Sequence, residues 1–70
     1  MIVKMESYFD GEMWCARGLG TDIFTHGASY DALIENVREA VGVHFDEQDE
    51  VSEVLLLSEI KIKNAPLAVG

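Results

Sequence analysis

The 70-residue sequence has a single cysteine, Cys15, a single proline and only five lysine and arginine residues. One cysteine excludes a disulfide within the chain, and no residues have the spacing of a structural zinc site. A chain this short is expected to form one domain whose folding hides only about 60% of the unfolded surface. Because neither disulfides nor metals stabilise so small a core, and 49% of the residues are hydrophobic, the sequence predicts self-association.

Positive charge is scarce, because 13 acidic residues against five basic ones leave a formal net charge of −8. Such a surface repels nucleic-acid phosphates, which argues against direct nucleic-acid binding and favours a basic protein as partner. The sequence also has no run of 18 consecutive apolar residues and no signal peptide, so we expect no membrane association. With one free thiol, the pattern indicates a cytoplasmic protein.

What the sequence does contain is one strong helical pattern among several strand patterns. Ser29 is a good N-cap, and apolar residues then recur at helical spacing: Tyr30, Leu33, Ile34, Val37, Ala40, Val41 and His44 or Phe45. Strands are predicted over residues 2–9, 12–18, 22–26 and 54–63. Gly27 is expected to supply an unusual backbone angle before the helix. These elements predict an α+β fold (β-β-β-α-β), an antiparallel three- to four-stranded sheet with one α-helix packed on one face.

The first two predicted strands meet at Asp10-Gly11, a dipeptide typical of a two-residue type I′ turn. This turn would pair Ser7 with Trp14 and Met5 with Ala16 on the face better suited to the core. The opposite, amphipathic face would carry the pairs Tyr8–Met13, Glu6–Cys15 and Lys4–Arg17. On this second face we expect a partner-binding surface formed by Glu6, Tyr8, Met13 and Arg17.

In the last predicted strand, Leu55 and Leu57 lie on the face opposite to Val54 and Leu56. A fold with one helix has nothing to cover them, so we expect Leu55 and Leu57 to mediate self-association into a dimer or tetramer. The acidic segment 46–53 is interpreted as a solvated loop or as a docking patch for a basic partner. Residues 1–63 are predicted to form a single domain, and residues 64–70 a short extended or disordered tail.

Three groups of residues could suggest a catalytic, metal-binding or phosphate-binding site. They are Cys15, His26 and His44; Asp10, Asp22 and Glu35; and Gly18, Gly20 and Gly27. The first group lies on different elements at no recognisable spacing, and a lone strand cysteine is usually a small hydrophobe. The second would be a nuclease-type metal cluster, in which a hydrolase would bind magnesium or manganese, but 13 acids in 70 residues make chance groups common. The third lacks the helix and lysine that follow a phosphate loop. We therefore expect no enzyme, no cofactor and no metal.

The order of motifs resembles the HicB-like antitoxin family. The resemblance covers residues 1 to about 63 and is carried by these stretches: Asp10-Gly11, Trp14, Ala16, Thr25-His26-Gly27, Ser29-Tyr30-Asp31-Ala32-Leu33 and Asn36-Val37-Arg38-Glu39-Ala40. The sequence departs from the family pattern where Gly18-Leu19-Gly20-Thr21-Asp22 replaces a proline-rich bend and where Ala32-Leu33 replaces Glu-Ala. It also lacks the C-terminal DNA-binding domain of many relatives, so autorepression by this chain alone is not expected.

The resemblance implies a partial ribonuclease-H-like fold without nuclease activity. It further implies that the chain binds and neutralises a small basic toxin, an mRNA-cleaving ribonuclease. The alternative hypothesis is a stand-alone oligomeric structural or adaptor domain with no toxin.

Overall fold

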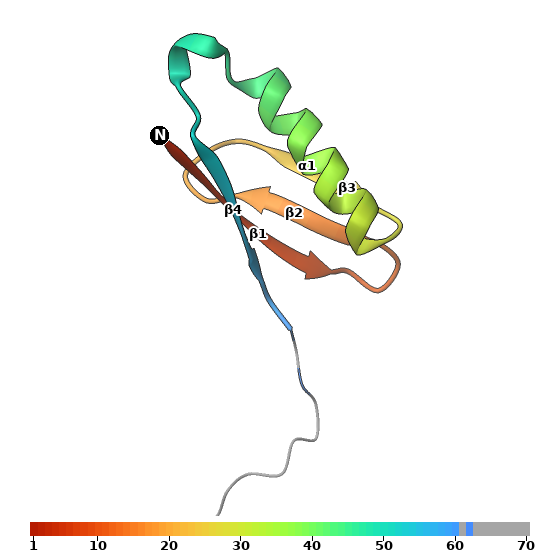
Figure 1. Ribbon diagram of the computed structural model, residues 1–70. Helices are drawn as coiled ribbons and strands as arrows, with labels where there is room; N and C mark the ends of the chain where they lie inside the picture. Colours follow the sequence, from red (N-terminus) through yellow and green to blue (C-terminus); the bar gives the residue numbers. More distant parts are fainter. Residues whose placement is uncertain (61, 63–70) are drawn as a thin grey trace, which may run out of the picture.

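The computed structural model describes residues 1–60 and 62, which form one four-stranded sheet and one long helix (Figure 1). In chain order the elements are β1 (Ile2–Phe9), β2 (Trp14–Gly18), β3 (Phe24–Gly27), α1 (Tyr30–His44), the short 3-10 helix η1 (Glu47–Asp49) and β4 (Glu53–Ser58). The predicted α+β class, with one helix on one face of the sheet, is confirmed. The predicted strand over 54–63 is shorter than expected, and residues 61 and 63–70, including the predicted tail, lie outside the described residues.

The sheet is mixed, so the prediction of a wholly antiparallel sheet is wrong. Its strand order is β3-β2-β1-β4. β2 pairs antiparallel with both β1 and β3, whereas β4 pairs parallel with β1. The physical reason is the connection: α1 carries the chain back along the sheet to the end where β1 begins. The next strand then runs in the direction of β1, as expected when a helix joins two parallel strands.

The helix begins and packs as its sequence predicts. The Ser29 hydroxyl accepts a hydrogen bond from the backbone N–H of Ala32 at 3.1 Å, which satisfies one of the free donors of the first turn. Leu33, Val37 and Val41 are buried against the sheet, where they meet Val3, Met5, Ala16 and Ile23. At the end of the helix Phe45 packs on this core while His44 is exposed, which resolves the two alternatives of the helical pattern.

The β1–β2 connection is longer than the predicted two-residue turn. Residues 10–13 form a loop in which Asp10 N–H donates to Met13 C=O at 3.0 Å. Consequently Ser7 pairs with Ala16 instead of Trp14, and Glu6 pairs with Arg17 instead of Cys15. A slip of two residues preserves the alternation of side chains, so both faces keep the residues assigned to them. Met13 is the exception, because it lies in the loop and not in β2.

Gly27 has a different role from the one predicted. Among the described glycines, the positive φ angles are those of Gly11 and Gly20, so Gly27 needs no special backbone angle. Instead, a Cβ atom at Gly27 would lie 2.6 Å from the backbone nitrogen of Leu33. Glycine therefore allows α1 to approach β3 closely.

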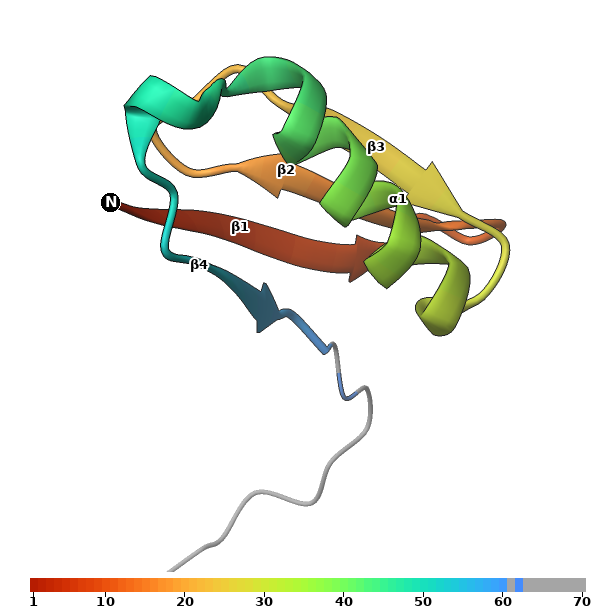
Figure 2. The same ribbon diagram turned by 45° about the horizontal axis from the view of Figure 1, so that its top comes forward.

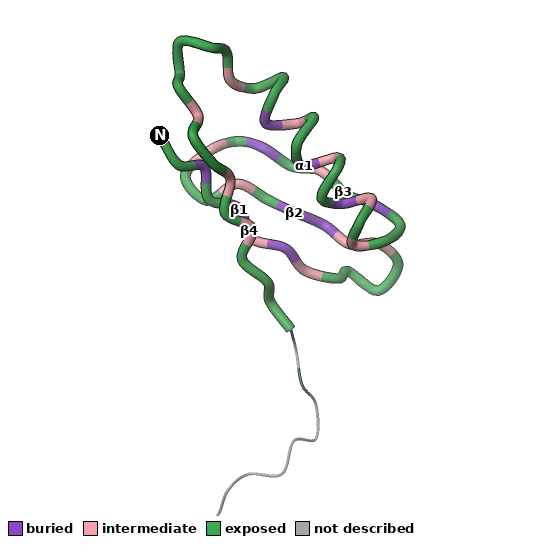
Figure 3. Tube along the Cα trace, viewed as in Figure 1, coloured by how far each residue is buried: buried purple, intermediate pink, exposed green. Residues whose placement is uncertain are grey.

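The two faces of the sheet have different environments. α1 lies across one face, packed on β3 and β2, and the buried residues of the tube in Figure 3 concentrate between this helix and the sheet (Figures 2 and 3). No described element covers the opposite side of the sheet. We call that side the open face.

Candidate functional site

The open face is built from alternate residues of all four strands. The register places these side chains on it: Ile2, Lys4, Glu6, Tyr8, Cys15, Arg17, Phe24, His26, Glu53, Leu55 and Leu57. Its exposed apolar side chains are Phe24, Leu57, Ile2 and Leu55, with 59%, 49%, 48% and 39% of their surfaces accessible. The face therefore combines apolar contact area with both signs of charge, a combination found at protein interfaces.

Three of the predicted partner-binding residues lie side by side at the centre of this face. Arg17 Nη2 donates to Glu6 Oε1 at 2.7 Å, and the guanidinium carbon lies 5.9 Å from the centroid of the Tyr8 ring. The hydrogen bond to Glu6, followed by the charge of that carboxylate, raises the pKa of Arg17 above its ordinary value, so the guanidinium stays protonated. Together with Phe9 and Glu59, the three residues line a hollow of about 310 Å³.

Met13 does not belong to this group. It lies in the β1–β2 loop, where its N–H donates to Asp10 Oδ1 at 2.8 Å and its C=O accepts from Asp10. The predicted pair Tyr8–Met13 is replaced by Tyr8–Cys15. Of the four predicted partner-binding residues, Glu6, Tyr8 and Arg17 therefore lie on strands of the open face, and Met13 does not.

Leu55 and Leu57 lie on the open face of β4, the outermost strand next to β1. Their ladder partners are Lys4 and Glu6, so the leucines extend the central group toward the edge of the sheet. Both remain substantially exposed, as the sequence predicts for residues that no helix covers. Their role in self-association stays a prediction.

The structure also brings together residues that the sequence reasoning left apart. Cys15 lies directly opposite His26, and its thiol is 3.6 Å from Asp10 Oδ2, to which it donates. Burial, followed by the charge of Asp10 and this hydrogen bond, raises the pKa of the Cys15 thiol. A raised pKa disfavours the thiolate, which is the nucleophilic form of cysteine.

The carboxylate of Asp10 forms hydrogen bonds within the β1–β2 loop. Its Oδ1 accepts from the backbone N–H groups of Glu12 and Met13 at 2.9 and 2.8 Å, and these bonds lower the pKa of its carboxyl group. Asp22 lies beyond the opposite end of β2, and Glu35 lies on α1, 4.0 Å from Arg38. In residues 1–60 and 62, no group of three or more His, Cys, Asp or Glu side chains is arranged to hold a metal ion.

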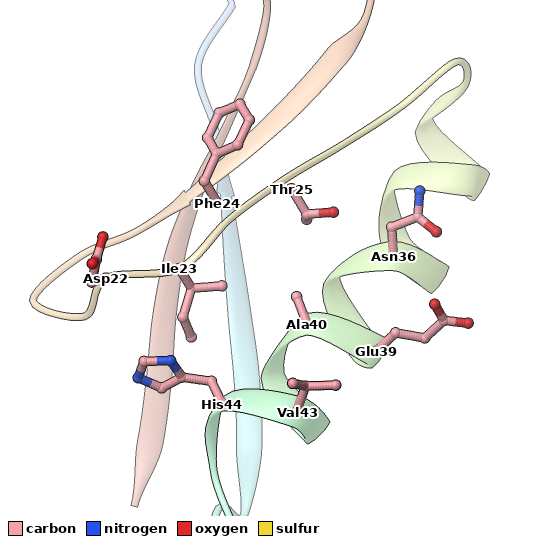
Figure 4. Close-up of a pocket in the computed structure, with 9 residues that line it drawn as sticks. All are labelled: Asp22, Ile23, Phe24, Thr25, Asn36, Glu39, Ala40, Val43 and His44. Carbon is pink, nitrogen blue, oxygen red and sulfur yellow. The ribbon is translucent and has the colours of Figure 1, made fainter.

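A groove of about 460 Å³ runs along the seam between α1 and the segment leading into β3 (Figure 4). Asn36 Nδ2 donates to the C=O of His26 at 2.7 Å and fastens the helix to β3 beside this groove. The acidic side chains Asp22 and Glu39 lie on opposite sides of it in Figure 4, so their charges do not converge on one point. His44, the remaining member of the Cys15, His26 and His44 group, also lines this groove. Its ring makes an edge-to-face contact with Phe45, with 4.8 Å between the ring centroids.

Compared with protein-family models, curated proteins and solved structures, the chain matches none. Within the described part of the chain, no helix has the length and apolar character that a membrane crossing needs. The open face is therefore interpreted from its own geometry together with the motifs of the sequence.

Proposed function

We propose that the chain is a non-catalytic binding module of the HicB-like antitoxin type. In this role it binds and neutralises a small basic protein, an mRNA-cleaving ribonuclease, in the cytoplasm. The observation that carries the proposal is the open face, on which Glu6, Tyr8 and Arg17 lie between exposed apolar side chains with no described element above them. The order β-β-β-α-β, with one α-helix among the described residues, agrees with the partial ribonuclease-H-like fold that the sequence resemblance implies.

The charge distribution supports a basic partner that is attracted at long range. The described charged side chains around the open face are Lys4 and Arg17 against Glu6, Glu53 and Glu59, so two positive and three negative charges leave this face close to neutral. Most of the net charge of −8 therefore lies elsewhere. Such a field steers a basic protein toward the chain, while the contact itself depends on Tyr8 and the apolar side chains.

The acidic segment before β4 adds to this field. Asp46 caps η1 by accepting from Gln48 N–H at 2.9 Å, and Asp49 Oδ2 accepts from Asp46 N–H at 2.9 Å. This reciprocal capping holds the acidic residues in a defined turn. Both interpretations of the segment, solvated loop and docking patch, remain compatible with it.

The proposal predicts that a neighbouring gene encodes a basic protein of about one small domain, and the test uses that protein. The two proteins should form a complex by isothermal titration calorimetry, and the complex should cleave RNA more slowly than the basic protein alone. The association rate should fall as salt rises from low to physiological concentration. No complex, or a complex with undiminished cleavage, would refute the proposal.

A variant pair locates the contact on the open face. Tyr8→Ala removes a half-buried aromatic side chain from the open face, so the complex should weaken by about tenfold or more. Val43→Ala is the matched control, because Val43 is 88% exposed on α1, on the other side of the sheet, and its replacement should leave affinity unchanged. Equal binding by wild type and Tyr8→Ala would show that the partner uses another surface.

We further propose that the chain self-associates into a dimer or tetramer through the strand that carries Leu55 and Leu57. The exposed leucines at the edge of a small sheet also favour the alternative function, an oligomeric adaptor domain without a toxin. The two functions differ in one observation, which is whether a basic ribonuclease accompanies the chain and is inhibited by it.

A further inference from the structure

The outer edge of β4 is free in the described structure. β4 is the last strand of the order β3-β2-β1-β4, and only β1 pairs with it. Glu59 N–H donates to the C=O of Ser7 at 2.9 Å, and in a parallel ladder alternate residues bond to the same neighbour. The N–H and C=O groups of Val54, Leu56 and Ser58 therefore point outward, away from β1.

The sequence of β4 contains no feature that would prevent another strand from pairing with this edge. Natural edge strands usually carry proline, lysine or a bulge that prevents pairing with another chain. β4 reads Glu-Val-Leu-Leu-Leu-Ser, with no charge after Glu53 and an unbroken register against β1. The strand thus presents both free backbone groups and apolar side chains.

Both sides of β4 offer apolar surface beside the free edge. Leu55 and Leu57 lie on the open face, while Val54 and Leu56 lie on the helix side. There α1 packs on β3 and β2 and leaves β4 beyond its edge, as Figure 2 shows. The result is a groove of about 490 Å³ lined by Tyr30, Ile34, Val37, Arg38, Val54 and Leu56.

We propose that a second copy of this chain pairs with β4 through its own β4, antiparallel across a two-fold axis at Leu56. The two four-stranded sheets would join into one continuous sheet, with about six new backbone hydrogen bonds between Val54, Leu56 and Ser58 of the two copies. Leu55 would lie opposite the partner's Leu57 on the open face, and Leu56 opposite its own counterpart on the helix side. This inference rests on the self-association part of the proposed function and supplies its geometry.

The occupant is a second copy because β4 is complementary to itself. A two-fold contact requires one surface to fit its own copy, and the uncharged stretch centred on Leu56 meets this requirement in the antiparallel register. The acidic segment 46–53 precedes β4 at one end of the strand (Figure 1). Antiparallel pairing places the acidic segments of the two copies at opposite ends of the joined strands, where their repulsion is smallest.

The same register predicts the salt dependence of the dimer. Glu53 would lie opposite the partner's Glu59, and each copy carries a formal net charge of −8. Salt screens both repulsions, so self-association should tighten as ionic strength rises. Association with a basic partner should respond in the opposite direction, and the two contacts can therefore be told apart.

The first experiment is sedimentation velocity of the full chain from about 1 to about 100 μM, a range that detects a micromolar dimer. The test pair is Leu56→Pro and Leu56→Ala. Alanine removes the side chain and keeps the outward N–H, whereas proline removes both, so Leu56→Pro should dimerise at least about tenfold more weakly than Leu56→Ala. Equal dimerisation by the two variants, or a monomeric wild type throughout the range, would overturn the inference.

The second experiment uses the wild-type chain and does not depend on the folding of a variant. In amide hydrogen exchange, Val54, Leu56 and Ser58 should be protected, and their protection should increase with protein concentration. A dimer in which these three amides exchange freely would place self-association elsewhere and refute the β4 pairing, while leaving the proposed partner binding intact. Protection in a monomer would show that the chain's own C-terminal residues cover this edge, and would also refute it.

Discussion

Replacing Gly27 with alanine should destabilise the fold through the contact between β3 and α1. The added Cβ would lie 2.6 Å from Leu33 N and 2.9 Å from both Ala32 C and Leu33 Cα. All three are backbone atoms, so no side chain can turn aside, and α1 must shift although Leu33 is fully buried. Overpacking of this kind costs about 3 kcal/mol, and the reduced entropy of the unfolded chain returns up to about 1 kcal/mol.

The net loss of about 2 kcal/mol corresponds to a fall in Tm of about 8–16 °C for a domain of this size. The assay is thermal unfolding followed by circular dichroism, at one fixed protein concentration because self-association makes Tm depend on concentration. Gly42→Ala is the matched control within the same chain. A Cβ there meets nothing within 4 Å, and alanine favours the helix by about 1 kcal/mol, so its Tm should rise by about 4–8 °C. A Tm for Gly27→Ala at or above that of the wild type would refute the close-approach argument.

Two further predictions use Asp10→Asn, which removes the charge of the loop carboxylate and keeps its shape. The folded-state pKa of Asp10 lies below its ordinary value of 3.8, so its charge stabilises the fold above that pH and the contribution disappears as pH falls through the folded pKa. Wild type should therefore be more stable than Asp10→Asn near neutral pH in urea unfolding, with the difference shrinking below pH 3.8; a constant difference down to about pH 2 would contradict this. Because Asp10 also raises the pKa of the Cys15 thiol, the midpoint of iodoacetamide alkylation against pH should move lower in Asp10→Asn, and an unmoved midpoint would show that burial alone sets it.

The helix and the two faces of the sheet could be predicted because their signals are local. Ser29 and the apolar stripe after it specify where α1 begins and which side it buries. Strand alternation assigns each side chain to a face, and the assignment of Glu6 and Arg17 survived a change of register because the slip was even. The sequence therefore predicted which strand residues lie on the open face, although it did not predict their cross-strand pairs.

The remaining features depend on contacts that a local pattern does not encode. Asp10-Gly11 is also compatible with a longer loop, and the Asp10 side chain selects it by accepting from two backbone N–H groups. That loop removed Met13 from the open face and placed Cys15 opposite Tyr8. The separate β2–β3 register places Cys15 opposite His26. The parallel direction of β4 likewise follows from where α1 delivers the chain, which neither strand pattern contains.

The two proposed contacts are linked through charge. Two copies joined at β4 would bring together two chains with a formal net charge of −8 each, and this repulsion opposes the hydrogen bonds and leucine contacts of the shared edge. A basic partner on each open face would neutralise part of that charge without occupying the outward backbone groups of Val54, Leu56 and Ser58. Partner binding would thus favour dimerisation, and by thermodynamic reciprocity dimerisation would favour partner binding. A strongly acidic chain, whose edge strand in the described structure has no charge after Glu53 and no second neighbour, is consistent with a module that forms its dimer when its partner is bound.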